Sequence, residues 1–509
     1  MKKYIVSFFC FIFLLGCEKD LLDQTNPNTL TPDNFWKTEA DATSGIIGAY
    51  SPMSTVFYHG RIWYIVELQR SDEIVNPGTI GGGLYLFNAN PSDGNYANAF
   101  SEMWKVIFRA NQVLQNVPNI EMDATYKDNI LGEAYFLRAI NYFVLVNHFK
   151  NVPLVTIPAG SLAETQQPPV DSSLIYDQIK ADLNSAIPLL PTSWDEINKG
   201  RITKGAASAL LGKTHLYLED WEEAVSEFNK IIAGTYGNFD LMPNYGDNFL
   251  ESTENNMESL FEIQFDNTGA WSAGWGSDVP STARFSSFDR DWTTYWINPF
   301  VLDLFLKETT NSGAIDPRAF ETIVWNYPDA EYFNGDLFAN KFANEIANHE
   351  ADPTTVRRPI RAAKYVEPFS GGPTPAFFTN GNNKRIIRLA DVLLMHAEAE
   401  NEANGPTVSA YTSINRVRAR VDMPNIPENL SKEDFRQRVR DERVLELCNE
   451  SQRPLDLQRW GMIPSRFEND PSLRNEKTNY VPGREYFPIP QIEIDTNPAY
   501  EGKQNEGYQ

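Results

Sequence analysis

The stretch GAASALLGKTHLYLEDWEEAVSEFNKII, residues 205–232, decides the fold because it contains two helical patterns with small residues where the helices would meet. Gly212 follows Leu211, Ala224 comes twelve residues after that glycine, and Phe228 comes four residues later. This is the spacing of a tetratricopeptide unit, in which small residues let two antiparallel helices approach and an aromatic ring fills the gap. A single unit cannot bury its apolar face alone, so further helical pairs are expected to stack on it.

Other stretches supply those pairs. Apolar residues recur at helical spacing over 100–117, and 13 of the 19 residues in 131–149 are apolar, which predicts a buried helix. These two helices are the expected neighbours of the unit. A second, weaker copy of the pattern lies near the C-terminus, at Leu393, Ala397, Ala399, Ala410, Ile414 and Val417.

The helical periodicity stops between about 236 and 385, where Gly, Asn, Asp and Pro occur in loop proportions and LFEIQF (260–265) alternates like a strand. The predicted fold class is therefore mainly α: tetratricopeptide-like helical pairs form a scaffold that carries a loop-rich, irregular insert with short strands. The predicted organisation is a signal peptide at 1–16, a lipidated tether at 17–34, a helical region at 35–235, an aromatic-rich ligand-binding region at 236–385, and C-terminal helices with an extended tail at 386–509.

Charge and cysteine count exclude several function classes. The chain of 509 residues has 44 Lys+Arg and 68 Asp+Glu, a net charge of −24. This argues against nucleic acid as a partner, because phosphates need basic side chains to neutralise them. Only three cysteines are present, Cys10, Cys17 and Cys448, which is too few for a disulfide framework or a cysteine-type zinc site.

The N-terminus has the pattern of an export signal. Lys2 and Lys3 precede an apolar run of 13 residues, 4–16, which is too short to cross a bilayer. The run ends in Leu-Leu-Gly-Cys, which resembles a bacterial lipobox with Cys17 as the acylated first residue of the mature chain. An ordinary signal peptide with a chance cysteine is the alternative. Cleavage before Cys17 would change the net charge to 42 − 68 = −26.

Aromatic residues concentrate where recognition is expected. Ten lie within 261–300, and Trp271 and Trp275 sit among Gly, Ser and Ala with no apolar periodicity. Such rings are candidate platforms for a flat, C–H-rich ligand such as a sugar. Packing of the rings into a small core beneath the loops is the alternative. The candidate ligand-binding residues are Trp271, Trp275, Trp292, Trp296, Tyr85 and Asn88.

Catalytic, cofactor and metal signatures are absent from the sequence. Three of the five histidines, His148, His215 and His396, lie in helical patterns and are expected to be structural. The acidic residues are too numerous for composition to exclude a paired-carboxylate hydrolase, although no pair stands out. Glutamates and arginines at spacings of three and four over 432–450 predict a ladder of ion pairs along one helix, which residues 453–460 could extend into a partly buried network.

With these pieces in order, the sequence resembles the SusD/RagB family of surface glycan-binding lipoproteins of Bacteroidota. The resemblance runs over nearly the whole chain. It rests on Cys17 with its acidic followers and on the blocks DNFWKTEADATSGIIGAY (33–50), ELQRSDEIV (67–75), WKVIFRANQVLQNV (104–117), AYFLRAINYFVLVNHFKNVPLV (134–155), IIRLADVLLMHAEAENEANG (386–405), RDERVLELCNESQRPLDLQRWG (440–461) and YFPIPQIEIDTNPAYEGKQNEGY (486–508). Where the family has a Glu-Gly pair, this chain has Glu450-Ser451, which bears on the conformation of that turn.

The resemblance implies a non-catalytic lipoprotein that is anchored through its acylated N-terminus to outer-membrane lipid at the cell surface. There it would bind oligosaccharide or polysaccharide without a cofactor and deliver it to a partner, a SusC-like TonB-dependent transporter, for nutrient uptake. The helical scaffold would meet the transporter barrel. Capture of oligopeptides by the same lid architecture is the alternative, and a surface glycoside hydrolase is a further one.

Overall fold

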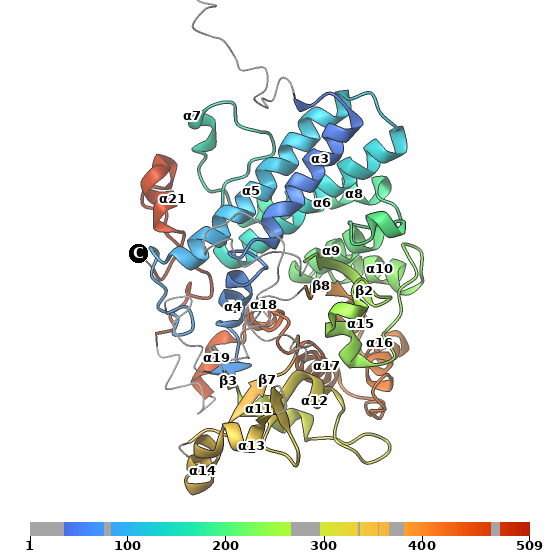
Figure 1. The fold of residues 1–509 in the computed structure, drawn as a ribbon, viewed down its shortest axis with the longest axis vertical. Helices are drawn as coiled ribbons and strands as arrows, with labels where there is room; N and C mark the ends of the chain where they lie inside the picture. The colour runs from blue at the N-terminus through green and yellow to red at the C-terminus, as the bar shows by residue number, and fades with distance from the viewer. Residues whose placement is uncertain are drawn as a thin grey trace, which may run out of the picture.

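The computed structural model describes residues 35–75, 83–265, 296–333, 336–354, 356–365, 381–469 and 479–508. Four helices lie side by side at one end of the molecule: α3 (Glu39–Tyr50), α5 (Gly94–Asn116), α6 (Ala124–Phe149) and α8 (Ser172–Leu189) (Figure 1). Each begins at a polar residue whose side chain accepts a hydrogen bond from a backbone N–H of the first turn, which satisfies a donor that the helix cannot.

The decisive stretch forms the predicted hairpin, α9 (Lys204–Tyr217) and α10 (Trp221–Ile232). Gly212 of α9 meets the ring of Phe228 of α10 so closely that a Cβ on the glycine would lie 2.6 Å from it. Ala224 and Phe228 are fully buried. The tetratricopeptide-like pairing is therefore confirmed, with small residues and one aromatic ring at the contact.

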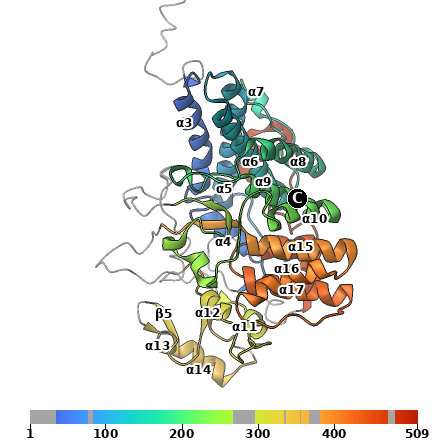
Figure 2. The same ribbon diagram turned by 90° about the vertical axis from the view of Figure 1, so that its right-hand side faces the viewer.

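The pairs continue as a stack. α10 packs on α15 (Leu389–Asn404), which packs on α16 (Val408–Ala419) and α17 (Lys432–Leu447), so the second copy of the pattern forms the expected helices (Figure 2). Toward the N-terminus, α9 packs on α8, α8 on α6, and α6 on α5. Of the two helices expected beside the unit, α6 does contact α9, but α8 is the main neighbour of α9 on that side, and α5 packs on α6 instead.

Two helices illustrate what periodicity reveals and what it misses. The C-terminal two-thirds of α6 is buried on every side, as its apolar composition predicts. Helix α4 (Ile62–Leu68) was not predicted, and all seven of its residues are buried. A short helix that is covered all round has no polar face and therefore no helical period to detect.

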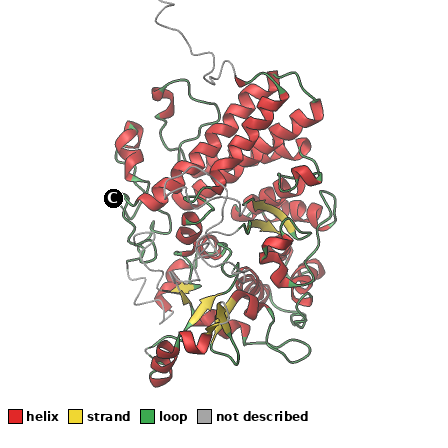
Figure 3. Ribbon diagram, in the orientation of Figure 1, coloured by secondary structure: helices red, strands yellow, loops and turns green. Residues whose placement is uncertain are grey.

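The region 236–365 and the chain ends add short elements. The strands that the described residues contain form four antiparallel pairs: β1 (Ile74–Val75) with β3 (Trp296–Ile297), β2 (Ser259–Ile263) with β8 (Lys384–Arg388), β4 (Ile323–Trp325) with β7 (Ile360–Ala362), and β5 (Glu331–Phe333) with β6 (Asp336–Leu337) (Figure 3). The predicted strand at 260–265 corresponds to β2. The other α-helices within the described ranges are α7 (Leu162–Thr165), α11 (Pro299–Phe305), α12 (Arg318–Thr322), α13 (Phe338–Lys341), α14 (Ala343–Ala351), α18 (Arg453–Arg459), α19 (Ile463–Asn469) and α21 (Gln491–Thr496).

The acidic face of α17 does not form the predicted ladder along the helix. The carboxylates of Glu442 and Glu446 instead contact arginines of other elements, including Arg318, whose Nη1 lies 2.6 Å from the first and 3.0 Å from the second. Arg388 likewise contacts Glu450 at 2.8 Å. The ladder prediction was wrong and the buried network was right, because the partners come from distant segments that spacing within one helix cannot reveal.

The turn after α17 keeps a conformation suited to glycine although its residue is serine. Ser451 has φ of 64°, in the left-handed region that costs a residue with a Cβ about 1–2 kcal/mol. Its hydroxyl oxygen is buried without a hydrogen-bond partner. Ser451 therefore holds a backbone conformation that favours glycine, at a local cost in stability.

The mainly α fold class predicted from the sequence is confirmed. A large hydrophobic core runs from α3 to residues near the C-terminus and includes both β2 and α15. Within the described residues, no helix combines the length and the apolar character needed to cross a membrane. The division into regions stays a prediction.

Candidate functional site

Two short sheets bring together the ends of the loops in which ligand-binding residues were predicted. In the first sheet Val75 of β1 pairs with Trp296 of β3, next to the segments 76–82 and 266–295. In the second, Ile263 of β2 pairs with Lys384 of β8, and the Phe265 N–H donates to the Asn383 side chain at 2.7 Å. The second sheet therefore places the residues just before 266–295 next to the residues just after 366–380.

The predicted site residues fall into two groups. Cys17, Trp271, Trp275 and Trp292 lie outside the described residues. Trp296, Tyr85 and Asn88 are described. Asn88 is exposed.

Tyr85 and Trp296 are less open to a ligand than loop positions suggest. The Tyr85 side chain is only 6% exposed. Trp296 is half-buried: the Arg361 guanidinium lies 3.5 Å from the centroid of its ring, and the Phe342 ring packs edge-on at 6.0 Å. Sugar stacking needs a free aromatic face, and Arg361 covers one face of Trp296. The ligand-binding roles of both residues stay predictions.

Glu73, immediately before β1, carries a buried carboxyl group next to the first of these sheets. It is 1% exposed, and its carboxylate accepts only a long hydrogen bond, 3.4 Å, from the Asn449 N–H. Burial raises the pKa of Glu73 to about 8, although Arg453 opposes the shift. Its backbone carbonyl accepts a hydrogen bond of 2.7 Å from the Asn298 N–H, so the residue is built into the sheet that holds the loop ends.

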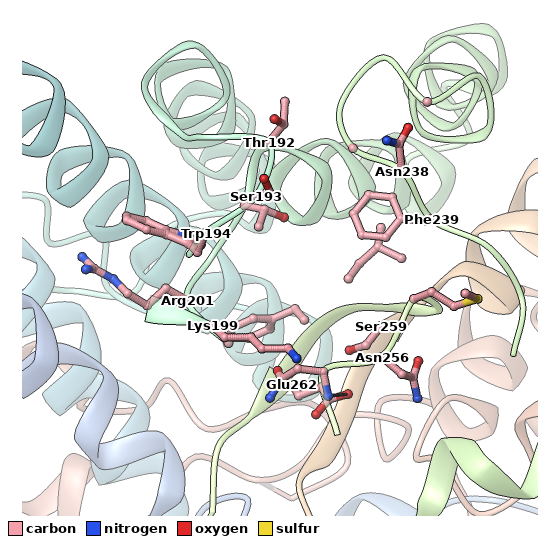
Figure 4. Close-up of a pocket in the computed structure, with 18 of the residues that line it drawn as sticks. Thr192, Ser193, Trp194, Lys199, Arg201, Asn238, Phe239, Asn256, Ser259 and Glu262 are labelled. Atoms are coloured by element: carbon pink, nitrogen blue, oxygen red, sulfur yellow. Dashed lines mark hydrogen bonds between the residues drawn. The ribbon is translucent and has the colours of Figure 1, made fainter. Parts of the chain in front are cut away.

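A separate groove was missed by the sequence analysis. It has a volume of about 460 Å³ and lies between three segments, 192–203, 234–239 and 255–262 (Figure 4). Trp194 and Phe239 stand on opposite sides of it. Its residues come from two connections and from strand β2 with the residues before it, so no linear motif could reveal it. The one available signal was Trp194 in the loop PTSWDEINKG (191–200), an aromatic beside turn residues like Trp271.

Histidines and acidic residues form no metal centre within the described ranges, where no group of three or more His, Cys, Asp or Glu side chains could hold an ion. His148 and His396 lie inside helices, as expected. The His148 Nδ1 is 2.9 Å from the Val144 carbonyl, and the His396 Nδ1 is 2.8 Å from the Ser413 hydroxyl. Burial lowers the pKa of both, which favours neutral imidazoles with a structural role.

Comparison with known proteins agrees with this architecture. The model of the SusD family matches residues 244–508, and a model described as starch-binding associating with outer membrane matches residues 82–218. The chain belongs to the SusD family. SusD-like protein P25 of Formosa agariphila is 26% identical to it, over 98% of this chain and 97% of its own length.

Solved structures match over almost the same extent. A SusD superfamily protein from Bacteroides vulgatus has a TM-score of 0.79 at 25% identity, covering 93% of this chain and all of its own. A structure described as a laminarin binding SusD-like protein has a TM-score of 0.73 at 26% identity, with the same coverage. The helical stack and its short sheets are therefore the fold of this family.

Proposed function

We propose that the protein binds glycans at the cell surface without cleaving them and passes them to a SusC-like TonB-dependent transporter. The observation that carries the proposal is the match over 93% of the chain to a laminarin-binding member of the same family. The family model described as starch-binding associating with outer membrane supports the same class of ligand and the same location. Attachment to the outer membrane would come from acyl chains on Cys17, since two or more chains hold a protein stably on a lipid surface.

The loops whose ends meet at the two sheets are the proposed binding face. Trp271, Trp275 and Trp292 would supply aromatic platforms, with Trp296, Tyr85 and Asn88 at the edge of the face. The pairing of β1 with β3 and of β2 with β8 supports this proposal, because it fixes both ends of the aromatic segment on the scaffold. A platform held by a rigid frame loses less conformational entropy when it binds.

Affinity electrophoresis tests the proposal. The protein without its signal would migrate in native gels that contain laminarin, starch, xylan or pectin. We expect retarded migration in at least one gel and a weaker retardation in a Trp271→Ala/Trp275→Ala variant. Phe108→Ala is the matched control, because Phe108 is an aromatic 49% exposed on α5, outside these loops. Equal migration of wild type and double variant on every glycan would refute the proposal.

Two further outcomes separate the alternatives. Incubation with the retained glycan should leave its chain length unchanged by mass spectrometry, whereas shortened products would indicate a hydrolase. Oligopeptides recovered from the purified protein, together with no retention on any glycan, would replace glycan by peptide as the ligand.

A further inference from the structure

The groove between residues 192–203, 234–239 and 255–262 has a fixed aromatic wall. The Trp194 indole N–H donates to the Ile202 carbonyl at 2.8 Å, and the Arg201 guanidinium lies 4.2 Å from the Trp194 ring centroid. Arg201 is itself held by the buried carboxylate of Glu133, with a nitrogen–oxygen distance of 3.0 Å. The indole is therefore positioned before any ligand arrives, which lowers the entropic cost of binding.

The opposite wall depends on glycine. The Phe239 ring sits against Gly205 and Gly237, where an added Cβ would lie 2.6 Å and 2.7 Å from it. Gly237 also has φ of 136°, a backbone conformation that residues with a Cβ rarely adopt. The local sequence thus seats one aromatic ring on each side of a groove whose volume, about 460 Å³, is in the usual range for ligand sites.

Several polar side chains that line the groove are available to hydrogen-bond a ligand. Within the part of the chain that the structure describes, five polar side chains in the lining form no hydrogen bond, namely those of Thr192, Ser193, Thr235, Asn238 and Ser259. Asn255, in contrast, exchanges two hydrogen bonds with Gln264. Hydroxyl and amide groups that lack protein partners can donate to and accept from a polyhydroxylated ligand.

The charge of the lining favours a neutral ligand. Of its three charged residues, Arg201 is bound to Glu133, and the Glu262 carboxylate accepts hydrogen bonds from Asn255 and Asn383. Only Lys199 is exposed, and its nearest carboxylate is the exposed Glu196 at 3.6 Å. A phosphate or a polyanion would need several unpaired cations here, whereas a neutral sugar needs aromatic faces and hydrogen bonds.

A second cavity adjoins the groove at residues 199–201. This cavity, of about 470 Å³, shares Lys199, Gly200 and Arg201 with the groove. Its rim includes Ile47, 60% exposed, and Ile197, 94% exposed. Apolar side chains can contact the C–H faces of further sugar rings, so the two cavities together suit an oligomer better than a monosaccharide.

We propose that this groove, with Trp194 and Phe239 as its walls, is a second binding site for neutral pyranose units, separate from the loop site. Tyr85, Asn88 and Trp296, the residues predicted for the loop site that the structure describes, do not line it. The inference rests on the proposed function for the class of ligand, but not for the place of binding. A second site would let one molecule hold a long glycan at two points, which increases avidity without any change at the first site.

Fluorine NMR distinguishes the two sites. The protein would be labelled with 5-fluorotryptophan at its eleven tryptophans, and the Trp194 resonance assigned by Trp194→Phe. Titration would use laminarihexaose, maltohexaose and a hexasaccharide of any glycan that retards the protein in gels. We expect the Trp194 resonance to move and saturate, both in wild type and in Trp271→Ala/Trp275→Ala.

A double alanine variant in the groove lining tests whether the ligand contacts the groove itself. Ser193→Ala/Asn238→Ala removes side chains that form no hydrogen bond with any described residue, so folding should be unaffected, and the midpoint at Trp194 should rise about three- to tenfold. Asn184→Ala, exposed on α8 outside the groove, should leave the midpoint unchanged. A stationary Trp194 resonance while other resonances move, or an unchanged midpoint in the double variant, would overturn the second site alone. If no resonance moves with any glycan, the proposed function fails as well.

Discussion

Replacing Asp72 by asparagine should test how the N-terminal and C-terminal parts of the chain are held together. The Asp72 carboxylate is fully buried and accepts hydrogen bonds from Arg453, at 2.8 Å and 2.9 Å, and from Arg466, at 2.6 Å. Asparagine offers one acceptor oxygen and no charge, so both guanidinium groups would lose their ionic partner.

The size of the effect follows from two estimates. Burial raises the pKa of Asp72, but Arg453 and Arg466 lower it further, to about 2 from 3.8. This difference corresponds to about 2 kcal/mol of folding free energy. Breaking a buried ion pair costs about 3–5 kcal/mol, so a loss of about 3 kcal/mol is expected at neutral pH. Because the folded pKa is the lower one, the ionic contribution is complete above pH 3.8 and disappears as the pH falls toward 2.

Urea denaturation followed by circular dichroism, from pH 7 to pH 3, measures both features. The difference between wild type and Asp72→Asn should be constant near neutral pH and fall by about 1 kcal/mol at pH 3. Asp303→Asn is the matched control, because Asp303 pairs with Arg358 at 3.3 Å on the surface, where the pair is worth about 0.5 kcal/mol. A loss in Asp72→Asn no larger than that of the control, or a difference independent of pH, would refute this reasoning.

Three other substitutions probe the scaffold. Gly212→Ala should lower stability by about 1–3 kcal/mol in thermal unfolding, because the new Cβ would lie 2.6 Å from the Phe228 ring. The control Gly48→Ala should be neutral or slightly stabilising, because a Cβ there has nothing within 4 Å. Equal effects of the two substitutions would contradict the packing argument. Ser451→Gly should stabilise by about 1 kcal/mol in urea, because it relieves a left-handed residue and removes an unpaired hydroxyl, and a loss of stability would be the contrary result. Glu73→Gln should remove a loss of stability that wild type shows as the pH rises from about 4.5 to 8, since the raised folded pKa favours the neutral carboxyl; parallel pH profiles would exclude this.

Local patterns predicted the scaffold well, because a helical hairpin is specified by residues close in sequence. Gly212, Ala224 and Phe228 lie within one such unit, and their spacing sufficed to predict α9 and α10. Helix α4 escaped because its complete burial erases periodicity.

The partners of charged residues could not be predicted in the same way. The carboxylates of α17 are evenly spaced, yet Arg318 and Arg388 reach them from segments far away in the sequence. Spacing shows that a charge lies on one helix face, but not which element packs there.

The candidate site was predictable only in part. An aromatic residue on a glycine-rich loop is a local signal, and it pointed to Trp271 and Trp275. The groove depends on Trp194 and Phe239, which are brought together by the folding of three segments, and its free polar groups can be recognised only when the hydrogen bonds of their neighbours are known.

The short sheets at the ends of residues 266–295 allow the sequence of this segment to be replaced without a change in the scaffold. Its ends are joined to the scaffold by backbone pairing, at Ile263 with Lys384 and at Val75 with Trp296, and backbone pairing tolerates many side chains. The entropy of closing a loop grows only with the logarithm of its length. Insertions and replacements between these two fixed points would therefore cost the helical stack little, so the proposed binding segment can change its ligand preference while the scaffold stays the same.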